Sequence, residues 1–174
     1  IITGASGDKR LFTINGATSV NVTFKDLTFS GNSTTLAGGS VLFNNIAGAT
    51  VNFNNCTLTN NSVNNGAGGG AIFFANGNLN IIDSSFDSNT SIEEAGAIFG
   101  QSGTITITNS LFKSNSAATK GGALYANSAN FTITGSTFYD NETTGDAGAV
   151  GGAALYVAGA NSTNSITNCT FYQN

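Results

Sequence analysis

Residues Gly69–Asn89 read GGAIFFANGNLNIIDSSFDSN, and nearly the same sequence returns at Gly121–Asn141 as GGALYANSANFTITGSTFYDN. Such self-similarity is typical of repeat proteins, in which each unit packs on the next. Both segments end on an apolar residue that is followed three positions later by Asn, a phrase that occurs six times. Its Asn residues are Asn32, Asn61, Asn89, Asn115, Asn141 and Asn174. Successive copies lie 29, 28, 26, 26 and 33 residues apart, which indicates a unit of about 26 residues that takes insertions.

The pattern within each unit predicts β-strands. Apolar residues alternate with polar ones ahead of the phrase, as at Val51 and Phe53 or at Ile105 and Ile107, and a period of two is typical of strands. Residue types that favour turns stand three positions before each apolar residue of the phrase. These corner residues are Asp26, Asn55, Asp83, Asn109, Gly135 and Asn168. Because no stretch has a helical period, each unit is predicted to hold three short strands joined by corners.

Two repeat architectures compete for this pattern. The stretch FKDLTFSGN at Phe24–Asn32 matches the leucine-rich-repeat consensus, but later units place Ser84, Ser110 and Ser136 where its middle Leu belongs. An all-β, right-handed parallel β-helix (a solenoid) accommodates every strand, because each coil stacks on the next at about 4.8 Å. We therefore predict three strands per coil and about six coils. Residues 1–174 form a single β-helix segment, which we expect to be part of a longer protein.

Equivalent residues of successive coils meet directly in such a fold, so the same residue type recurs because it stacks on itself. The six Asn residues of the phrase are predicted to form one inward ladder of amides. An aromatic stack is predicted beside it, made of Phe29, Phe86, Phe112, Phe138 and Phe171. Small Gly and Ala residues before Ile, Leu or Val allow the backbone to turn into the narrow core.

The composition excludes several classes of function. Charged residues make up 8% of the chain and the formal net charge is −4, with no basic cluster, which argues against nucleic-acid binding. No apolar run approaches the roughly 20 residues that a membrane-spanning helix needs, so we expect no membrane contact by this segment. The exterior is predicted to consist mainly of hydroxyl and amide groups.

Paired G-G-A-[ILV] and F-x-x-N repeats resemble those of the chlamydial polymorphic membrane proteins, which are autotransported surface adhesins. The first motif is complete at Gly69–Ile72 and Gly121–Leu124, and the second is intact in five of the six units. The resemblance spans nearly the whole chain. It implies an autotransporter passenger that is secreted or held at the bacterial cell surface, with host or matrix surface molecules as partners.

The acidic residues offer little for catalysis. Asp87 and Lys113 share one repeat position, as do Glu94 and Lys120, so both pairs are predicted to be exposed ion pairs. One acidic cluster lies in the longest insertion, which is also the candidate contact loop. The cluster consists of Asp140, Glu142 and Asp146, and the candidate contact loop consists of Glu142, Thr143, Thr144, Gly145 and Asp146. Because the chain has no His to act as partner, we predict no catalytic residue, no cofactor and no metal site. A polysaccharide-binding or polysaccharide-degrading β-helix enzyme and weak calcium binding by this loop remain alternatives.

Threonine-rich stretches at Thr104–Thr108 and Thr132–Thr134 suggest an ice-binding solenoid as a further alternative. Outward Thr residues would form a flat array, although Thr also simply favours strands. The neighbouring coils interrupt that array with Asn52, Asn54, Asn80 and Ile82. A measurement of thermal hysteresis would discriminate this alternative.

The two cysteines are predicted to be reduced and buried. Cys56 and Cys169 share one column but lie four coils, about 19 Å, apart. A disulfide requires Cα atoms within about 7 Å, so the two residues cannot pair.

The sequence thus predicts a non-catalytic, structural surface rod that mediates adhesion or self-assembly. Loops, rather than a pocket, are expected to make its contacts with partners or with other copies of itself. The insertions proposed for this role are Ser33–Ala37, Ser62–Gly68 and Glu142–Gly151.

Overall fold

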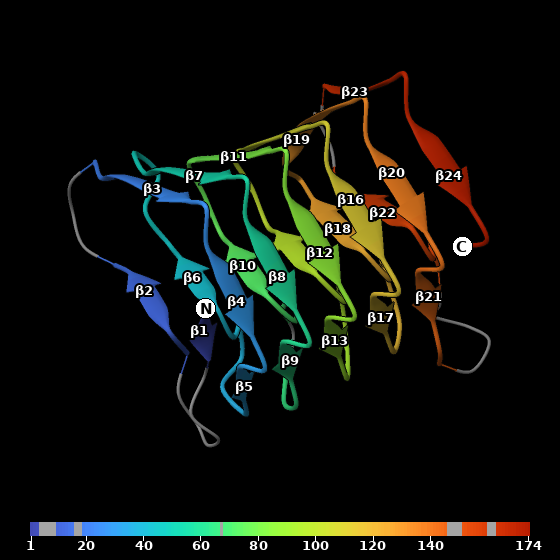
Figure 1. The fold of residues 1–174 in the computed structure, drawn as a ribbon, viewed down its shortest axis with the longest axis horizontal. Coiled ribbons are helices and arrows are strands. Elements are labelled where there is room, and N and C mark those ends of the chain that lie inside the picture. The colour runs from blue at the N-terminus through green and yellow to red at the C-terminus, as the bar shows by residue number, and fades with distance from the viewer. Residues whose placement is uncertain (4–9, 16–18, 67, 146–150, 160–162) are drawn as a thin grey trace.

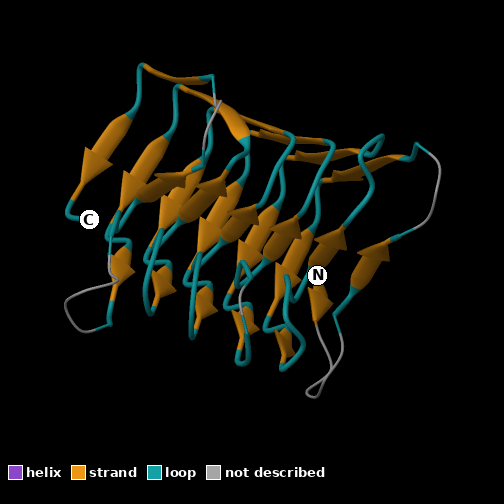
Figure 2. Cartoon of the chain, turned by 180° about the vertical axis from the view of Figure 1, so that it is seen from behind, coloured by secondary structure: helices purple, strands orange, loops and turns teal. Residues whose placement is uncertain are grey.

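The chain winds into a solenoid built from parallel β-strands (Figure 1). The computed structural model describes residues 1–3, 10–15, 19–66, 68–145, 151–159 and 163–174. Within these ranges the secondary structure consists of strands, turns and bends, and no helix occurs (Figure 2). The all-β parallel solenoid predicted from the sequence is confirmed. A leucine-rich repeat is wrong, because strands occupy every long side of the coil.

Four sheets run along the axis of the solenoid. Sheet A comprises β1 (Ile2–Thr3), β4 (Thr28–Ser30), β8 (Thr57–Thr59), β12 (Ser85–Asp87), β16 (Leu111–Lys113), β20 (Thr137–Tyr139) and β24 (Thr170–Tyr172). Sheet B comprises β2 (Phe12–Ile14), β6 (Leu42–Asn44), β10 (Ile72–Phe74), β14 (Ile98–Gly100), β18 (Leu124–Asn127) and β22 (Leu155–Ala158). Sheet C comprises β3 (Asn21–Lys25), β7 (Thr50–Asn54), β11 (Asn78–Ile82), β15 (Thr104–Thr108), β19 (Asn130–Thr134) and β23 (Asn164–Thr167). Sheet D comprises β5 (Ser33–Thr34), β9 (Ser62–Val63), β13 (Thr90–Ser91), β17 (Ser116–Ala117) and β21 (Glu142–Thr143).

Sheet D is the part of the fold that the sequence did not predict. Each of its strands contains two residues and directly follows an Asn of the repeated phrase. A two-residue strand is too short to show the apolar–polar alternation by which strands are recognised. The three predicted sheets are present, and each complete coil passes through sheets C, A, D and B in that order. From β4 to β24 the chain completes five turns, so the six copies of the phrase mark the limits of five turns.

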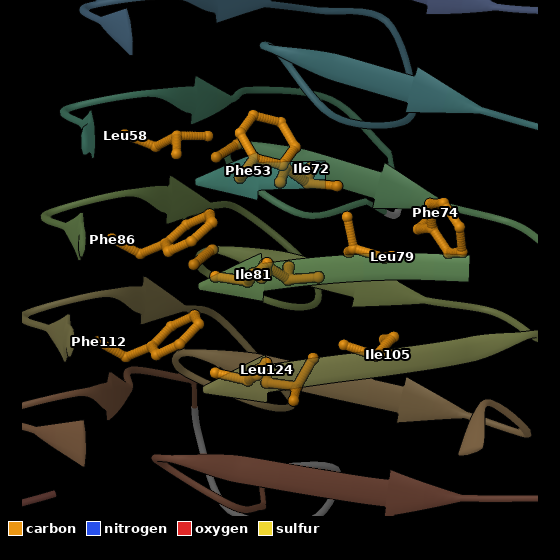
Figure 3. Close-up of a cluster of buried hydrophobic side chains, with 14 of the residues drawn as sticks. Phe53, Leu58, Ile72, Phe74, Leu79, Ile81, Phe86, Ile105, Phe112 and Leu124 are labelled. Carbon is orange, nitrogen blue, oxygen red and sulfur yellow. The ribbon is translucent and has the colours of Figure 1, made fainter. Parts of the chain in front are cut away.

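The register explains why the unit repeats. Phe86 in β12 pairs with Leu58 of the preceding coil and Phe112 of the following coil, and Ile107 in β15 lies between Ile81 and Ile133. Alternate residues of each strand point inward, and they form one apolar core that follows the axis. Figure 3 shows this column arrangement for Leu58, Phe86 and Phe112.

The two corners that flank sheet A have left-handed backbone in every coil. All six predicted corner residues, from Asp26 to Asn168, have φ between 49° and 61°. A second set stands immediately before each Asn of the repeated phrase, with φ between 50° and 68°. It comprises Gly31, Asn60, Ser88, Ser114, Asp140 and Gln173. Asn, Asp and Gly tolerate this conformation better than other residues, which accounts for much of the second set as well as for the first.

The register also locates the insertions. Nine positions separate Leu42 in sheet B from Val51 in sheet C, whereas seven separate Ile72 from Leu79, so the first unit has two extra residues at the B–C corner. The predicted first insertion at Ser33–Ala37 is therefore largely misplaced. Each of the three predicted insertions also begins with a strand of sheet D, because Ser33, Ser62 and Glu142 open β5, β9 and β21.

Candidate functional site

The Asn residues of the repeated phrase form one column of amides, hereafter the Asn ladder, which is buried from Asn32 to Asn141 and exposed at Asn174. The Nδ2 of each residue donates to the Oδ1 of the next, from Asn32 through Asn141 to Asn174, over 2.7–2.9 Å. The same Oδ1 accepts the backbone N–H of the preceding ladder residue at 3.0–3.1 Å. The ladder therefore connects every coil to the next through side chain and backbone together.

Each interior amide of the ladder also bonds to the strand before it. The Nδ2 of Asn115 donates to the carbonyl of Phe86 at 3.0 Å, and that of Asn141 donates to the carbonyl of Phe112 at 3.0 Å. Such an amide makes two donations and accepts two hydrogen bonds, which uses the capacity that a primary amide has. Asn89, Asn115 and Asn141 can thus be buried without leaving polar groups unpaired.

Four of the five predicted phenylalanines form a stack. The rings of Phe86, Phe112, Phe138 and Phe171 are nearly parallel, and successive centroids lie 4.8, 4.8 and 4.9 Å apart. Phe29 does not join them, because Leu58 occupies the coil between Phe29 and Phe86. Its ring instead meets other rings edge-on. They are those of Phe12, Phe24 and Phe53.

Serine forms a second inward column beside the Phe stack. The backbone N–H of Ser84 donates to the Oγ of Ser110 at 3.1 Å, and that of Ser110 donates to the Oγ of Ser136 at 3.0 Å. Each Ser hydroxyl donates in turn to the carbonyl two residues earlier. These hydroxyls satisfy corner N–H groups that a Leu would leave unpaired, which is why Ser is favoured there.

The two cysteines continue the Ser column and differ in exposure. Both are free, Cys56 is buried, and Cys169 is half-buried. The expectation that both are fully buried is therefore wrong for Cys169. Burial raises the pKa of the Cys56 thiol above its ordinary value.

We expect a thiol reagent added to the native protein to modify Cys169 first and Cys56 much more slowly. Burial limits access to Cys56, and its raised pKa reduces the fraction of reactive thiolate. Mass spectrometry of timed samples would identify the modified residue, and two thiols should titrate after denaturation in urea. Equal native rates for the two residues would contradict this burial pattern.

Only one of the two predicted ion pairs forms among the described residues. Lys120 Nζ lies 3.1 Å from Glu94 Oε1, and this hydrogen bond raises the pKa of Lys120. Asp87 and Lys113 are paired across β12 and β16, but the carboxylate of Asp87 instead accepts the hydroxyl of Ser88 at 2.8 Å. A partly exposed pair such as Glu94–Lys120 contributes at most about 1 kcal/mol.

The candidate contact loop and the acidic residue before it, Asp140, are hydrogen-bonded to the preceding coil. Asp140 accepts the Ser114 hydroxyl at 3.1 Å, and Glu142 accepts the Ser116 hydroxyl at 3.0 Å. Thr143 belongs to β21, and the backbone N–H groups of Thr144 and Gly145 donate to the carbonyls of Ala117 and Ala118 at 2.9 and 2.7 Å. Asp146, the last residue of the predicted contact loop, lies outside the described residues.

An aromatic column on the outer side of sheet B was missed by sequence reasoning. Phe73, Phe99, Tyr125 and Tyr156 lie one above another, with centroids 5.1, 4.9 and 5.2 Å apart. Lys120 Nζ lies 5.6 and 5.8 Å from the two Tyr rings. The signal was present, since an aromatic follows the Ile or Leu in GGAIFF, AGAIFG and GGALYA.

The middle of this outer column is packed away from solvent. Phe99 and Tyr125 are each 5% exposed and form a small second core with Ala95. Burial also raises the pKa of Tyr125. The column therefore stabilises the connection that leads from sheet D to sheet B.

The described part of the chain offers no concave or metal-ligating site. It holds no pocket, and no group of three or more of its Asp, Glu, His or Cys residues converges on a common point. The same residues include no helix long and apolar enough to cross a membrane. The surfaces that this part of the chain offers are its outer sheet faces and its corner loops.

Comparison with known proteins agrees with this geometry. A family model described as a right handed beta helix region matches residues 12–174. No curated protein and no solved structure matches the chain. The family match gives the stacked sheets the right-handed sense that was predicted from the sequence.

Proposed function

The chain belongs to the right-handed β-helix family, and from this premise we propose that it is a non-catalytic structural rod of a bacterial cell surface that mediates adhesion or self-assembly. The observation that carries the proposal is the Asn ladder, which runs from Asn32 to Asn174 without a missing member. A side-chain column that bonds every coil to the next gives an extended and stiff body. Stiffness over length is what a surface rod requires.

The use of the interior supports a structural role. The inward positions of the described coils are occupied by the apolar core, the Asn ladder and the Ser column, which all connect one coil to its neighbours. Solenoids of this kind commonly place their function on loops and outer faces. Contacts by this protein are accordingly proposed for its loops and faces.

The repeat motifs are the basis for proposing a particular class of surface protein. Their resemblance to the chlamydial polymorphic membrane proteins supports an autotransporter passenger that is exported to the cell surface. Host or matrix surface molecules, or further copies of the chain, are the partners that we propose. The charge of −4, with no basic cluster, favours such partners over nucleic acid.

Absence of catalysis is part of the proposal. Asp140 and Glu142 are hydrogen-bonded to serine hydroxyls of the preceding coil, and general acid–base catalysis needs a partner group of matched pKa. The competing function, a polysaccharide-degrading β-helix, predicts turnover of a neutral or acidic polysaccharide that is lost in Asp140→Asn. Such turnover would show that the protein is an enzyme and would contradict the proposal of a non-catalytic rod.

The adhesive role can be tested by one deletion that the register defines. The backbone of Lys120 pairs with that of Glu94 in the preceding coil and with that of Gly151 in the following coil. The Gly145 N–H donates to the Ala118 carbonyl in the preceding coil. Residues 146–150 are therefore the five residues by which the fifth unit exceeds the regular one at this corner. Their deletion joins Gly145 to Gly151 in the way that Thr119 is joined to Lys120.

We expect the deletion of 146–150 to retain the circular dichroism spectrum and the urea midpoint, and to lower binding to cultured cells and to immobilised matrix proteins. Ile92→Ala is the matched control, because Ile92 is exposed in the regular loop at the same corner of an earlier coil. It should leave binding unchanged. If the shortened protein is folded and binds as well as the original, the loop hypothesis is wrong.

A further inference from the structure

The outer face of sheet C is the most regular surface in the described chain. Its strands β7, β11, β15 and β19 have five residues each, and neighbouring strands pair residue for residue. Strands lie about 4.8 Å apart, and alternate residues along a strand about 6.7 Å apart. The outward side chains therefore occupy a rectangular net on the row of strands from β3 to β23, whose backbone is drawn in Figure 1.

The net is chemically uniform as well as regular. Its middle column consists of Thr23, Asn52, Asn80, Thr106, Thr132 and Ser165. The first column contains Asn21, Thr50, Asn78, Thr104 and Asn130, and the third contains Lys25, Asn54, Ile82, Thr108, Thr134 and Thr167. All positions except Lys25 and Ile82 carry a hydroxyl or a primary amide. None of these side chains is buried.

Hydrogen bonds within the face hold part of the net in place. The Nδ2 of Asn80 donates to the Oδ1 of Asn52 at 2.9 Å. The Nδ2 of Asn52 donates in turn to Asn21 Oδ1 at 3.2 Å and to Thr23 Oγ1 at 3.1 Å. The Asn residues that interrupt the Thr pattern in the sequence thus continue the same polar net. Side chains fixed in this way lose less conformational entropy when they bind.

The other faces lack these properties. Sheet A places Asp87, Lys113 and Tyr139 on its outer side, and sheet B places its aromatic column there. Sheet D has two-residue strands. Only sheet C, among the described residues, combines three outward columns with a nearly uncharged surface.

We propose that the outer face of sheet C binds ice. Ice is an uncharged, rigid lattice of hydroxyl-like donors and acceptors, and it matches the face in charge and in kind of group. Many weak contacts add up when both partners repeat periodically, and the paired strands of sheet C supply such a periodic face. This function is independent of adhesion through the loops.

Two features of the face favour ice over a polysaccharide surface. Its outward positions carry no aromatic ring, so a sugar would have no ring to stack on. The Thr side chains at 104, 106, 108, 132 and 134 present a methyl group beside each hydroxyl. A methyl group restricts the orientation of neighbouring water, while the hydroxyl bonds to it, and together they favour an ordered water layer.

The test measures thermal hysteresis and adsorption to a single seed crystal of ice, with the intact chain labelled at its N-terminal amine. We expect the original protein to shape the crystal and to delay its growth below the melting point. Thr132→Lys and Thr106→Lys should each lose the hysteresis, because a long charged side chain in the middle column holds the lattice away. Thr132 is exposed, so the first of these variants is expected to fold.

Thr57→Lys on the outer side of sheet A is the matched control, and it should retain the full hysteresis. Circular dichroism and urea unfolding establish that all three variants are folded. The proposal is overturned if the original protein neither adsorbs to ice nor shows hysteresis, or if Thr57→Lys loses as much as Thr132→Lys. Adsorption to crystalline cellulose or chitin without adsorption to ice would overturn it in favour of a polysaccharide surface.

Discussion

Asn115→Ala is expected to lower the free energy of unfolding by about 3 to 6 kcal/mol, because it interrupts the Asn ladder in the middle of the rod. The Asn115 amide makes four hydrogen bonds. They run to Asn141 Oδ1, to the Phe86 carbonyl, and from the side-chain and backbone nitrogens of Asn89. Asn89 is fully buried, and each buried polar group left without a partner costs about 1–3 kcal/mol.

Urea unfolding followed by circular dichroism would measure this loss. Asn78→Ala is the matched control, since Asn78 is exposed at the start of β11, and a substitution at such a surface position changes stability by about 0.5 kcal/mol or less. Similar urea midpoints for the two variants would mean that the ladder forms without contributing to stability. That result would remove the main argument for a stiff rod.

The Asn ladder could be predicted because its chemistry repeats in the sequence. Stacked amides require Asn at the same position of every coil, so Asn61, Asn89 and Asn115 are visible as a period. The left-handed corners from Asp26 to Asn168 were predictable for the same reason, since few residue types accept positive φ, whereas the second set, which includes Ser88 and Gln173, was not predicted. Features that require one residue type at the same position of every coil can therefore be predicted from a single sequence.

Structural features whose positions accept several residue types could not be predicted, because they leave no pattern in the sequence. Sheet D has strands of two residues, such as Thr90–Ser91, whose backbone bonds leave no pattern in the side chains. The first insertion was misplaced because the spacing between Asn32 and Asn61 gives its length but not its corner. Phe29 was assigned to the Phe stack although Leu58 lies between it and Phe86. The sequence already showed this interruption, because the second copy of the repeated phrase has Leu58 in place of Phe.

The candidate surfaces show the same division. Outward positions accept several residue types, so the sequence placed Asn52 and Asn80 in register with the Thr array but only as interruptions of it. The hydrogen bond from Asn80 to Asn52 shows that these residues continue the polar net. The Asp87–Lys113 pair illustrates the limit of repeat position alone. Shared register brought their backbones together, but the local hydroxyl of Ser88 took the carboxylate instead.

Gly96→Ala is expected to destabilise the rod by about 3 kcal/mol or more, although the change adds a single methyl group. The new Cβ would meet the carbonyl oxygen of Gly122 in the next coil and lie 2.6 Å from the backbone N of Ser116. Both obstacles are backbone atoms of paired segments, so neither can move as a side chain could. Overpacking of this kind commonly costs about 1–3 kcal/mol where side chains can adjust, and more where they cannot.

The Gly96 position therefore differs from a glycine needed only for its backbone conformation. Gly96 has no positive φ, whereas Gly31 has φ of 68° and open space within 4 Å of the point where a Cβ would stand. Gly31→Asn is the control, since Asn60 occupies the equivalent corner of the next coil with φ of 55°, and we expect it to change stability by less than about 1 kcal/mol. The comparison is made by urea unfolding of both variants. If Gly96→Ala unfolds at the same urea concentration as Gly31→Asn, close backbone contact between coils is not what requires glycine in the repeated Gly-Gly-Ala phrase.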